Sequence, residues 1–159
     1  MLNVDSLNPI EVSLIAASSV TLISGRPVRA SADGVAAPTT ITNVLGLVKE
    51  NYVAGVIDEI SGQYGIAGSG KATVFCHGVC TVQQSSINGT SYAVYDEAQT
   101  YVVDDTLYAN VSTGEITNAT GLDGVGPAGI TSNIRIGRVL EAPANPANGD
   151  PMKISVECL

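Results

Sequence analysis

The chain has 159 residues, the size of a single domain, and only 14% of them are charged, against about 25% in an average soluble domain. Its formal net charge of −8 repels phosphate backbones and anionic lipid heads, which excludes nucleic acid and membrane surfaces as favoured partners. No apolar run approaches the roughly 20 residues of a membrane-spanning helix. Uncharged polar residues must therefore form much of the surface, and other subunits often cover a surface of this kind.

Short runs rich in Val, Ile, Thr and Tyr recur along the chain, and Gly, Pro, Asn or Asp residues bound each of them, as is typical of strands and turns. The best helix candidate, 51–60, contains Gly55 and four β-branched residues, which disfavour a helix. The sequence therefore predicts an all-β fold, either a small β-barrel or a β-sandwich with long loops. The predicted strands are 11–17, 20–24, 28–31, 44–48, 53–57, 72–82, 91–95, 106–111, 134–140 and 152–156.

Two segments resemble each other. "PVRASADGVAAPT" (27–39) and "TLYANVSTGEITNAT" (106–120) each read as a strand ending in Ala, a Gly turn and a second strand of small residues. A hydrophobic strand around a glycine follows each of them, at 43–50 and 133–141. Two related half-domains would explain this pattern, and so would the general similarity of short β-hairpins.

The stretch "GIAGSGKAT" (65–73) is one residue away from the phosphate-binding pattern G-x-x-x-x-G-K-[ST], because Ala72 occupies the hydroxyl position and Thr73 follows one residue later. Such a loop needs a helix directly after the lysine, since the helix N-terminus binds the anion. The following run, "ATVFCHGVCTV", has the alternation of a strand. We therefore interpret the stretch as a turn between strands, with Lys71 solvated at its edge, and expect no cofactor.

The cysteines do not form an obvious site. Cys76 and Cys80 share a face of the predicted strand 72–82, and four residues of strand span roughly 13 Å, too far for a disulfide or a shared zinc ion. Cys158 makes the count odd, so we interpret all three as buried thiols in a reducing compartment. His77 is the sole histidine and has no G-x-S-x-G motif as a partner. We predict no metal site and no catalytic residue.

Carboxylates occur in adjacent pairs. Neighbours on a strand point to opposite faces, so no pair can by itself form the facing couple of a glycosidase, and the chain has no Trp to hold a sugar. We expect these acids to lie in solvated loops. Calcium binding at 104–105 or 121–126 is an alternative that lacks the D-x-D-x-D-G pattern. The pairs are Asp58-Glu59, Asp96-Glu97 and Asp104-Asp105.

With catalysis disfavoured, the residue pattern over 23–159 resembles that of bacteriophage head decoration (cement) proteins. The three cysteines and the loop "GLDGVGPAGITS" (121–132) depart from that pattern. The segments that carry the resemblance are "SGRPVRASADGVAAP" (24–38), "NVLGLVKE" (43–50), "GKATVFCHGVCTV" (70–82), "DDTLYANVSTGEIT" (104–117) and "IRIGRVLEAPANPANGDPMKISVECL" (134–159).

The resemblance implies a β-tulip-like structural protein without enzymatic activity. It implies a homotrimer that is made in the host cytoplasm, binds the major capsid protein on the outer capsid surface between capsomers, and stabilises the shell. Residues 23–159 would form one β domain, and residues 1–22 an N-terminal arm or the first strands. The expected capsid or subunit contacts are Leu7, Pro9, Ile10, Val12, Leu14, Pro38, Pro127, Pro143 and Pro146.

Other functions remain as alternatives. Another phage structural or adhesion domain, such as part of a tail or a tail fibre, would share the β content and the Gly/Asn turns. A carbohydrate-binding module is less favoured, because the chain has only six Tyr and one Phe to stack on sugars. A hydrolase is the least favoured, since it would depend on His77 alone.

Overall fold

The computed structural model describes residues 1–5, 8–37, 44–54, 70–121 and 133–158. These residues form strands and one turn of 3-10 helix, Pro146–Asn148, and none of them lies in an α-helix. No helix of bilayer-spanning length and hydropathy occurs in this part of the chain. The predicted all-β fold is confirmed. The strands are β1 (Leu2–Val4), β2 (Ile10–Ile15), β3 (Thr21–Leu22), β4 (Pro27–Ser31), β5 (Gly34–Ala36), β6 (Gly46–Val48), β7 (Tyr52–Val53), β8 (Lys71–Val82), β9 (Ser85–Ile87), β10 (Thr90–Tyr92), β11 (Thr106–Ala109), β12 (Ile116–Thr117), β13 (Ile134–Glu141) and β14 (Met152–Glu157).

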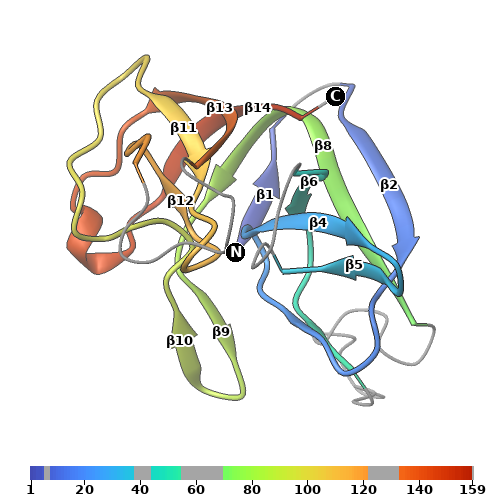
Figure 1. The fold of residues 1–159 in the computed structure, drawn as a ribbon. Coiled ribbons are helices and arrows are strands. Elements are labelled where there is room, and N and C mark those ends of the chain that lie inside the picture. Colours follow the sequence, from blue (N-terminus) through green and yellow to red (C-terminus); the bar gives the residue numbers. More distant parts are fainter. Residues whose placement is uncertain (6–7, 38–43, 55–69, 122–132, 159) are drawn as a thin grey trace.

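Most strands belong to one curled antiparallel sheet (Figure 1). Its order is β12-β11-β13-β14-β8-β6-β4-β5, and β1 and β2 also pair with β8. Two small pairs, β9–β10 and β3–β7, lie outside this sheet. The β9–β10 hairpin projects from the body of the molecule (Figure 1). Because the sheet curls, its strands enclose apolar side chains on the inside.

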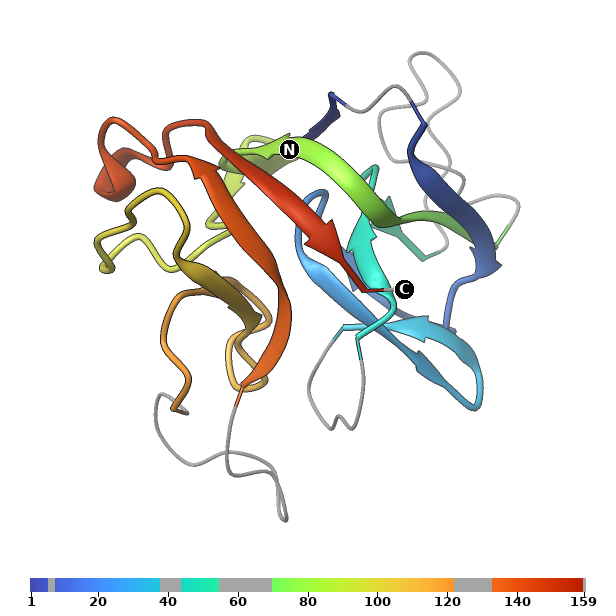
Figure 2. The same cartoon turned by 90° about the horizontal axis from the view of Figure 1, so that it is seen from above.

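Strand β8 is the shared wall of two hydrophobic cores and curves along its length (Figure 2). Gly78 has a φ of 129° in the middle of this strand, a backbone angle that residues with a Cβ rarely adopt. Before this glycine, Val74 and Cys76 enter one core, and after it, Cys80 and Val82 enter the other. Phe75, on the opposite face before the bend, already enters the larger core, so the bend turns the even-numbered side chains from the smaller core to the larger one.

The larger core contains two tyrosines in edge-to-face contact. The ring centroids of Tyr95 and Tyr101 are 5.4 Å apart, with an interplanar angle of 78°, a favourable aromatic geometry. The Tyr95 hydroxyl donates a hydrogen bond to the Asp150 carbonyl oxygen at 2.7 Å. The smaller core lies among β2, β4, β5, β6 and the first half of β8. Aliphatic side chains alternating along short strands thus supply most of the buried surface.

The two similar segments form the same three-stranded unit. Strand β4 pairs with β5 on one side and with β6 on the other, and β11 pairs in the same way with β12 and β13. The hairpins expected within 27–39 and 106–120 are therefore confirmed. The two units occupy opposite ends of the main sheet.

A glycine sits at the matching place in the third strand of each unit. A Cβ on Gly46 would overlap the carbonyl oxygen of Phe75 on β8, and a Cβ on Gly137 would overlap that of Ser155 on β14. Each glycine thus lets the outer unit approach the central pair of strands, β8 and β14.

Some strand boundaries differ from the sequence prediction. The expected strand at 91–95 ends at Tyr92, and the one at 20–24 covers only Thr21–Leu22. Strands β1 and β9 are additional, because Leu2–Val4 and Ser85–Ile87 are too short to show a clear alternation. Most of the expected strand at 53–57 lies outside the described residues. Pairing with distant partners, rather than local pattern, fixes where these strands begin and end.

Candidate functional site

The expected contact residues fall in two separate places. Pro9 precedes β2, and Ile10, Val12 and Leu14 lie on it, whereas Pro143 and Pro146 follow β13. The β2 strand and the Pro146–Asn148 turn lie on opposite sides of the molecule in both views (Figures 1 and 2). The structure therefore does not bring the two groups together. Leu7, Pro38 and Pro127 lie outside the described residues.

Exposure also divides these residues. Ile10 is 46% exposed, and Pro9 and Pro146 are half-buried. Val12 and Leu14 are half-buried too and pack against the smaller core. Pro143 is buried. Among these positions, Ile10 offers an apolar side chain most directly to a partner.

Among the described residues, strand β2 pairs fully along one edge and meets another strand only near its end along the other edge. It pairs with β8 from Ile10 opposite His77 to Ile15 opposite Lys71. Its other edge meets β5 at a single parallel bridge, Ala16 with Val35. A backbone hydrogen bond just beyond, from Ala17 N to the Val35 carbonyl at 2.9 Å, closes the ring of strands at that point.

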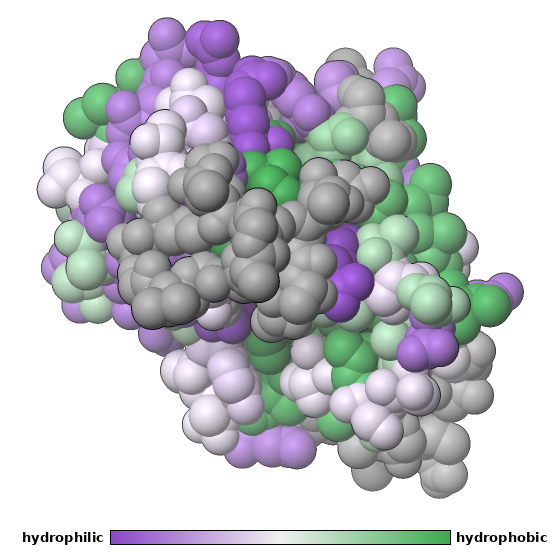
Figure 3. All heavy atoms as spheres, in the orientation of Figure 1, coloured by the Kyte–Doolittle hydropathy of each residue, from purple (hydrophilic) through white to green (hydrophobic). Residues whose placement is uncertain are grey.

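An apolar groove opens where β2 and the β4–β5 hairpin diverge from this bridge. Its volume is about 510 Å³, within the range of about 300–1,000 Å³ that is usual for ligand pockets. Apolar residues also gather on this side of the space-filling view (Figure 3). The sequence interpretation missed this groove, because its walls come from segments far apart along the chain. The lining residues are Ser13, Leu14, Ile15, Ala30, Ser31, Gly34, Val35, Leu45 and Lys71.

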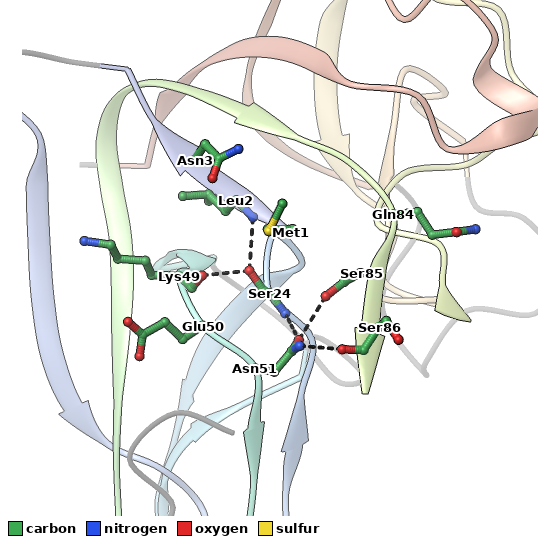
Figure 4. A pocket seen from close by; sticks show the side chains of 10 residues that line it. All are labelled: Met1, Leu2, Asn3, Ser24, Lys49, Glu50, Asn51, Gln84, Ser85 and Ser86. Carbon is green, nitrogen blue, oxygen red and sulfur yellow. Dashed lines mark hydrogen bonds between the residues drawn. The ribbon is translucent and has the colours of Figure 1, made fainter. Parts of the chain in front are cut away.

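A second hollow of about 550 Å³ is polar and lies beside β1 (Figure 4). Buried Ser24 accepts a hydrogen bond from Leu2 N at 3.0 Å and donates to the Lys49 carbonyl oxygen at 2.7 Å. Asn51 Oδ1 accepts from Ser24 N at 2.8 Å and from the Ser85 hydroxyl at 3.0 Å. These polar groups are satisfied by one another, so the network acts as a joint between segments.

The glycine-rich stretch does not form a phosphate-binding loop in its described part. Gly70 has a φ of 67° in a turn, and Lys71 is exposed and begins β8. A strand rather than a helix follows the lysine, which confirms the interpretation from the sequence. Residues 65–69 of this stretch lie outside the described residues.

All three cysteines are free thiols. Cys76 and Cys80 are buried, and burial raises the pKa of both. Burial and the nearby Cys76 also raise the pKa of Cys158 to about 12. These thiols are therefore protonated and weakly nucleophilic at neutral pH. His77 is exposed on β8, and no group of three or more His, Cys, Asp or Glu residues in the described part of the chain could hold a metal ion.

The described acidic pairs are engaged in loops. Asp96 Oδ1 accepts a hydrogen bond from Ala98 N at 3.0 Å. Asp104 pairs with Arg138 at 2.8 Å, whereas Asp105 accepts from Val102 N at 2.9 Å. These carboxylates lie in loops, as expected, and there they also bind backbone N–H groups and a side-chain cation. The pair Asp58-Glu59 lies outside the described residues.

Comparisons with known proteins support the fold. No protein-family model and no curated protein sequence matches the chain. A chain in the solved structure "The capsid of Myoviridae Phage XM1" is similar in fold, with a TM-score of 0.57. The match covers 96% of this chain and 86% of that chain at 17% sequence identity. This protein thus shares its all-β architecture, over nearly its whole length, with a chain found in a phage capsid.

Proposed function

We propose that this protein is a structural component of a phage virion, without enzymatic activity, that binds the outside of the capsid. The single observation that carries this proposal is the similarity of the whole fold to a chain of a phage capsid structure. A shared fold does not by itself fix a function, so the proposal also draws on the surface. The chain has few charged residues, and one edge of β2 is largely without strand partners among the described residues. Both properties suit a protein that functions by binding other protein subunits.

The proposed role is that of a decoration protein. Homotrimers would sit between capsomers, bind the major capsid protein and stabilise the shell. Each contact can be weak, because binding through several subunits multiplies modest affinities. An open strand edge such as that of β2 can also add backbone hydrogen bonds to a partner strand.

We assign the first capsid contact to Ile10. This side chain is 46% exposed at the start of β2, next to half-buried Pro9. Deleting residues 1–10 would be a poor test, because that deletion also removes β1 and the buried Leu2. Replacing Ile10 by Asp keeps β1 and Leu2 and changes a side chain that belongs to neither hydrophobic core.

The experiment mixes purified protein with capsids that lack it, pellets the capsids and counts the bound copies. We expect the wild-type chain to reach a stoichiometric plateau and to raise the temperature at which the shells break. Ile10→Asp should lower the occupancy by about 10-fold or more, since it places a charge in an apolar contact. The matched control is Ser91→Asp, an exposed position on the distant β10 strand.

Two results would contradict the proposal. Capsids that never retain the wild-type chain would exclude a decoration role. Binding to host cells or glycans in place of capsids would instead favour a tail or adhesion domain. Full occupancy by Ile10→Asp would exclude the contact at the start of β2 while leaving capsid binding intact.

A further inference from the structure

The turn that precedes β11 presents two valines to solvent. Val102 is 56% exposed and Val103 is 63% exposed. The Asp105 N–H donates to the Val102 carbonyl oxygen at 3.1 Å, and Asp104 has a φ of 75°, as at the third position of a type II turn. A non-glycine residue in this region carries strain and persists only where its surroundings hold it. The turn therefore displays its valines at some cost in stability.

Side-chain contacts hold this turn in place. The Asp105 carboxylate accepts a hydrogen bond from Val102 N at 2.9 Å and one from Asn118 Nδ2 at 3.0 Å. Asp104 pairs with Arg138 of β13 at 2.8 Å. The apolar surface at this turn is therefore preorganised, which lowers the entropy lost when it binds a partner.

The neighbouring part of β13 extends the same surface. Asp104 N donates to the Val139 carbonyl oxygen at 2.9 Å, and the next residue, Leu140, is 43% exposed. Glu141 is exposed as well. We call Val102, Val103 and Leu140 the valine corner. The residues beside it carry three carboxylates (Asp104, Asp105 and Glu141) against two cations, Arg138 and Lys153, which lies opposite Glu141 on β14, so the charge near the corner is negative by one.

The apolar groove beside β2 has complementary properties. Leu14, Ile15, Val35 and Leu45 line it. Lys71 also lines it, is exposed, and has no ion-pair partner among the described residues. In a chain with a net charge of −8, an unpaired cation beside an apolar groove favours an occupant that is apolar and acidic.

We propose that the valine corner of one copy of this chain docks into the β2 groove of a second copy. The corner and the groove are different surfaces, and the start of β11 and strands β2 and β5, which carry them, lie on opposite sides of the molecule in both views (Figures 1 and 2). The contact is therefore head-to-tail, and repeating it generates a closed ring or an open chain. This inference rests on the surface of the chain and not on the proposed role on capsids.

The test uses two variants that each damage one side of the contact. Val103→Asp puts a charge on the valine corner. Ile15→Asp puts one in the groove, directly across the strand pair from Lys71, so it also neutralises that cation. Both replaced side chains are more than half exposed, so neither change removes core packing. By analytical ultracentrifugation, each variant alone should self-associate about 100-fold more weakly than the wild-type chain.

The decisive measurement is the equimolar mixture of the two variants. The Ile15→Asp chain keeps an intact corner, and the Val103→Asp chain keeps an intact groove. The mixture should therefore form a one-to-one heterodimer that cannot grow further. Ser91→Asp is the control, since it adds the same charge at an exposed position of β10, outside both the valine corner and the groove, and it should self-associate like the wild-type chain.

Several results would overturn the inference. A wild-type chain that stays monomeric at its highest soluble concentration would do so, and so would variants that associate as tightly as the wild type. Two monomeric variants that fail to form a heterodimer would exclude a head-to-tail contact. Because no capsid is present, none of these results depends on whether the protein binds capsids.

Discussion

Gly46 and Gly137 are residues at which a single added methyl group would collide with backbone. Their missing side chains leave room for the carbonyl oxygens of Phe75 and Ser155 on the adjacent strands. In both cases the obstacle is backbone within a sheet, so it cannot turn aside as a flexible side chain could. Substitution at either glycine must therefore displace a strand.

We predict that Gly137→Ala and Gly46→Ala each lower the free energy of unfolding by about 1–3 kcal/mol or more, the usual cost of overpacking. Gly121→Ala is the control, because a Cβ there would meet no atom of the described residues within 4 Å. It should change the free energy of unfolding by no more than about 0.5 kcal/mol. Urea denaturation followed by circular dichroism measures all three. A Gly137→Ala protein as stable as Gly121→Ala would contradict the assigned register of β13 against β14.

At the scale of elements, one ion pair joins two distant segments. Arg26 lies between β3 and β4, and Glu115 directly precedes β12. The Arg26 Nη2 atom is 3.2 Å from Glu115 Oε1, and its Nε donates to the Ala93 carbonyl oxygen at 2.7 Å. Burial lowers the pKa of Arg26 and raises the pKa of Glu115, although each is the other's partner. Desolvation therefore offsets much of the attraction within this pair.

We predict that Arg26→Met at pH 7 lowers the free energy of unfolding by about 1–3 kcal/mol, because it leaves the Glu115 carboxylate without its cation. This is less than the 3–5 kcal/mol typical of fully buried pairs, since the Arg26 and Glu115 side chains are 22% and 21% exposed. The loss in the free energy of unfolding caused by Arg26→Met should be smaller at about pH 5 than at pH 7. Without Arg26 the pKa of Glu115 rises further, so the folded state takes up a proton that the unfolded state does not.

Urea denaturation of Arg26→Met and of the wild-type chain at both pH values tests this expectation. Arg138→Met is the control, because Arg138 and Asp104 form a pair on the surface with side-chain exposures of 47% and 75%. That variant should lose little stability at either pH. An Arg26→Met penalty that does not change with pH would contradict the proposed protonation of Glu115.

At the scale of the whole molecule, a thiol and a phenol with raised pKa values make the free energy of unfolding fall at alkaline pH. Burial raises the pKa of Cys158 from 9.0 to about 12 and that of Tyr95 from 10.0 to about 12. The unfolded chain therefore loses these protons at a lower pH than the folded chain does. This contribution to stability is fully present below pH 9 and is lost as the pH rises from 9 towards 12.

We predict that the urea midpoint of the wild-type chain falls steadily as the pH rises from about 9 to 11. Cys158→Ser should fall less steeply, because a serine hydroxyl does not titrate in this range. Below pH 9 neither protein loses this contribution, so any difference between their urea midpoints there measures the packing that the substitution removes. Parallel curves for the two proteins would show that the Cys158 thiol does not contribute to the alkaline loss.

The sequence by itself determined the all-β class, the strands around Gly78 and Gly137, the two similar hairpins, and the strand rather than helix after Lys71. These properties are local, because the alternation of side chains and the chemistry of turns act within a few residues. The resemblance to decoration proteins suggested both Ile10 and Pro143 as contact candidates, but the sequence could not separate exposed Ile10 from buried Pro143.

Only the tertiary structure decided which strands pair, how β8 divides two cores, and where the β2 groove and the valine corner lie. The groove joins Leu14 and Ile15 to Val35, Leu45 and Lys71, and the curl of the sheet brings these segments together. The valine corner depends in the same way on the contact between Asp104 and Arg138. Contacts between segments so distant along the chain leave no periodic signal, because they arise from the packing of the whole sheet and not from any one strand.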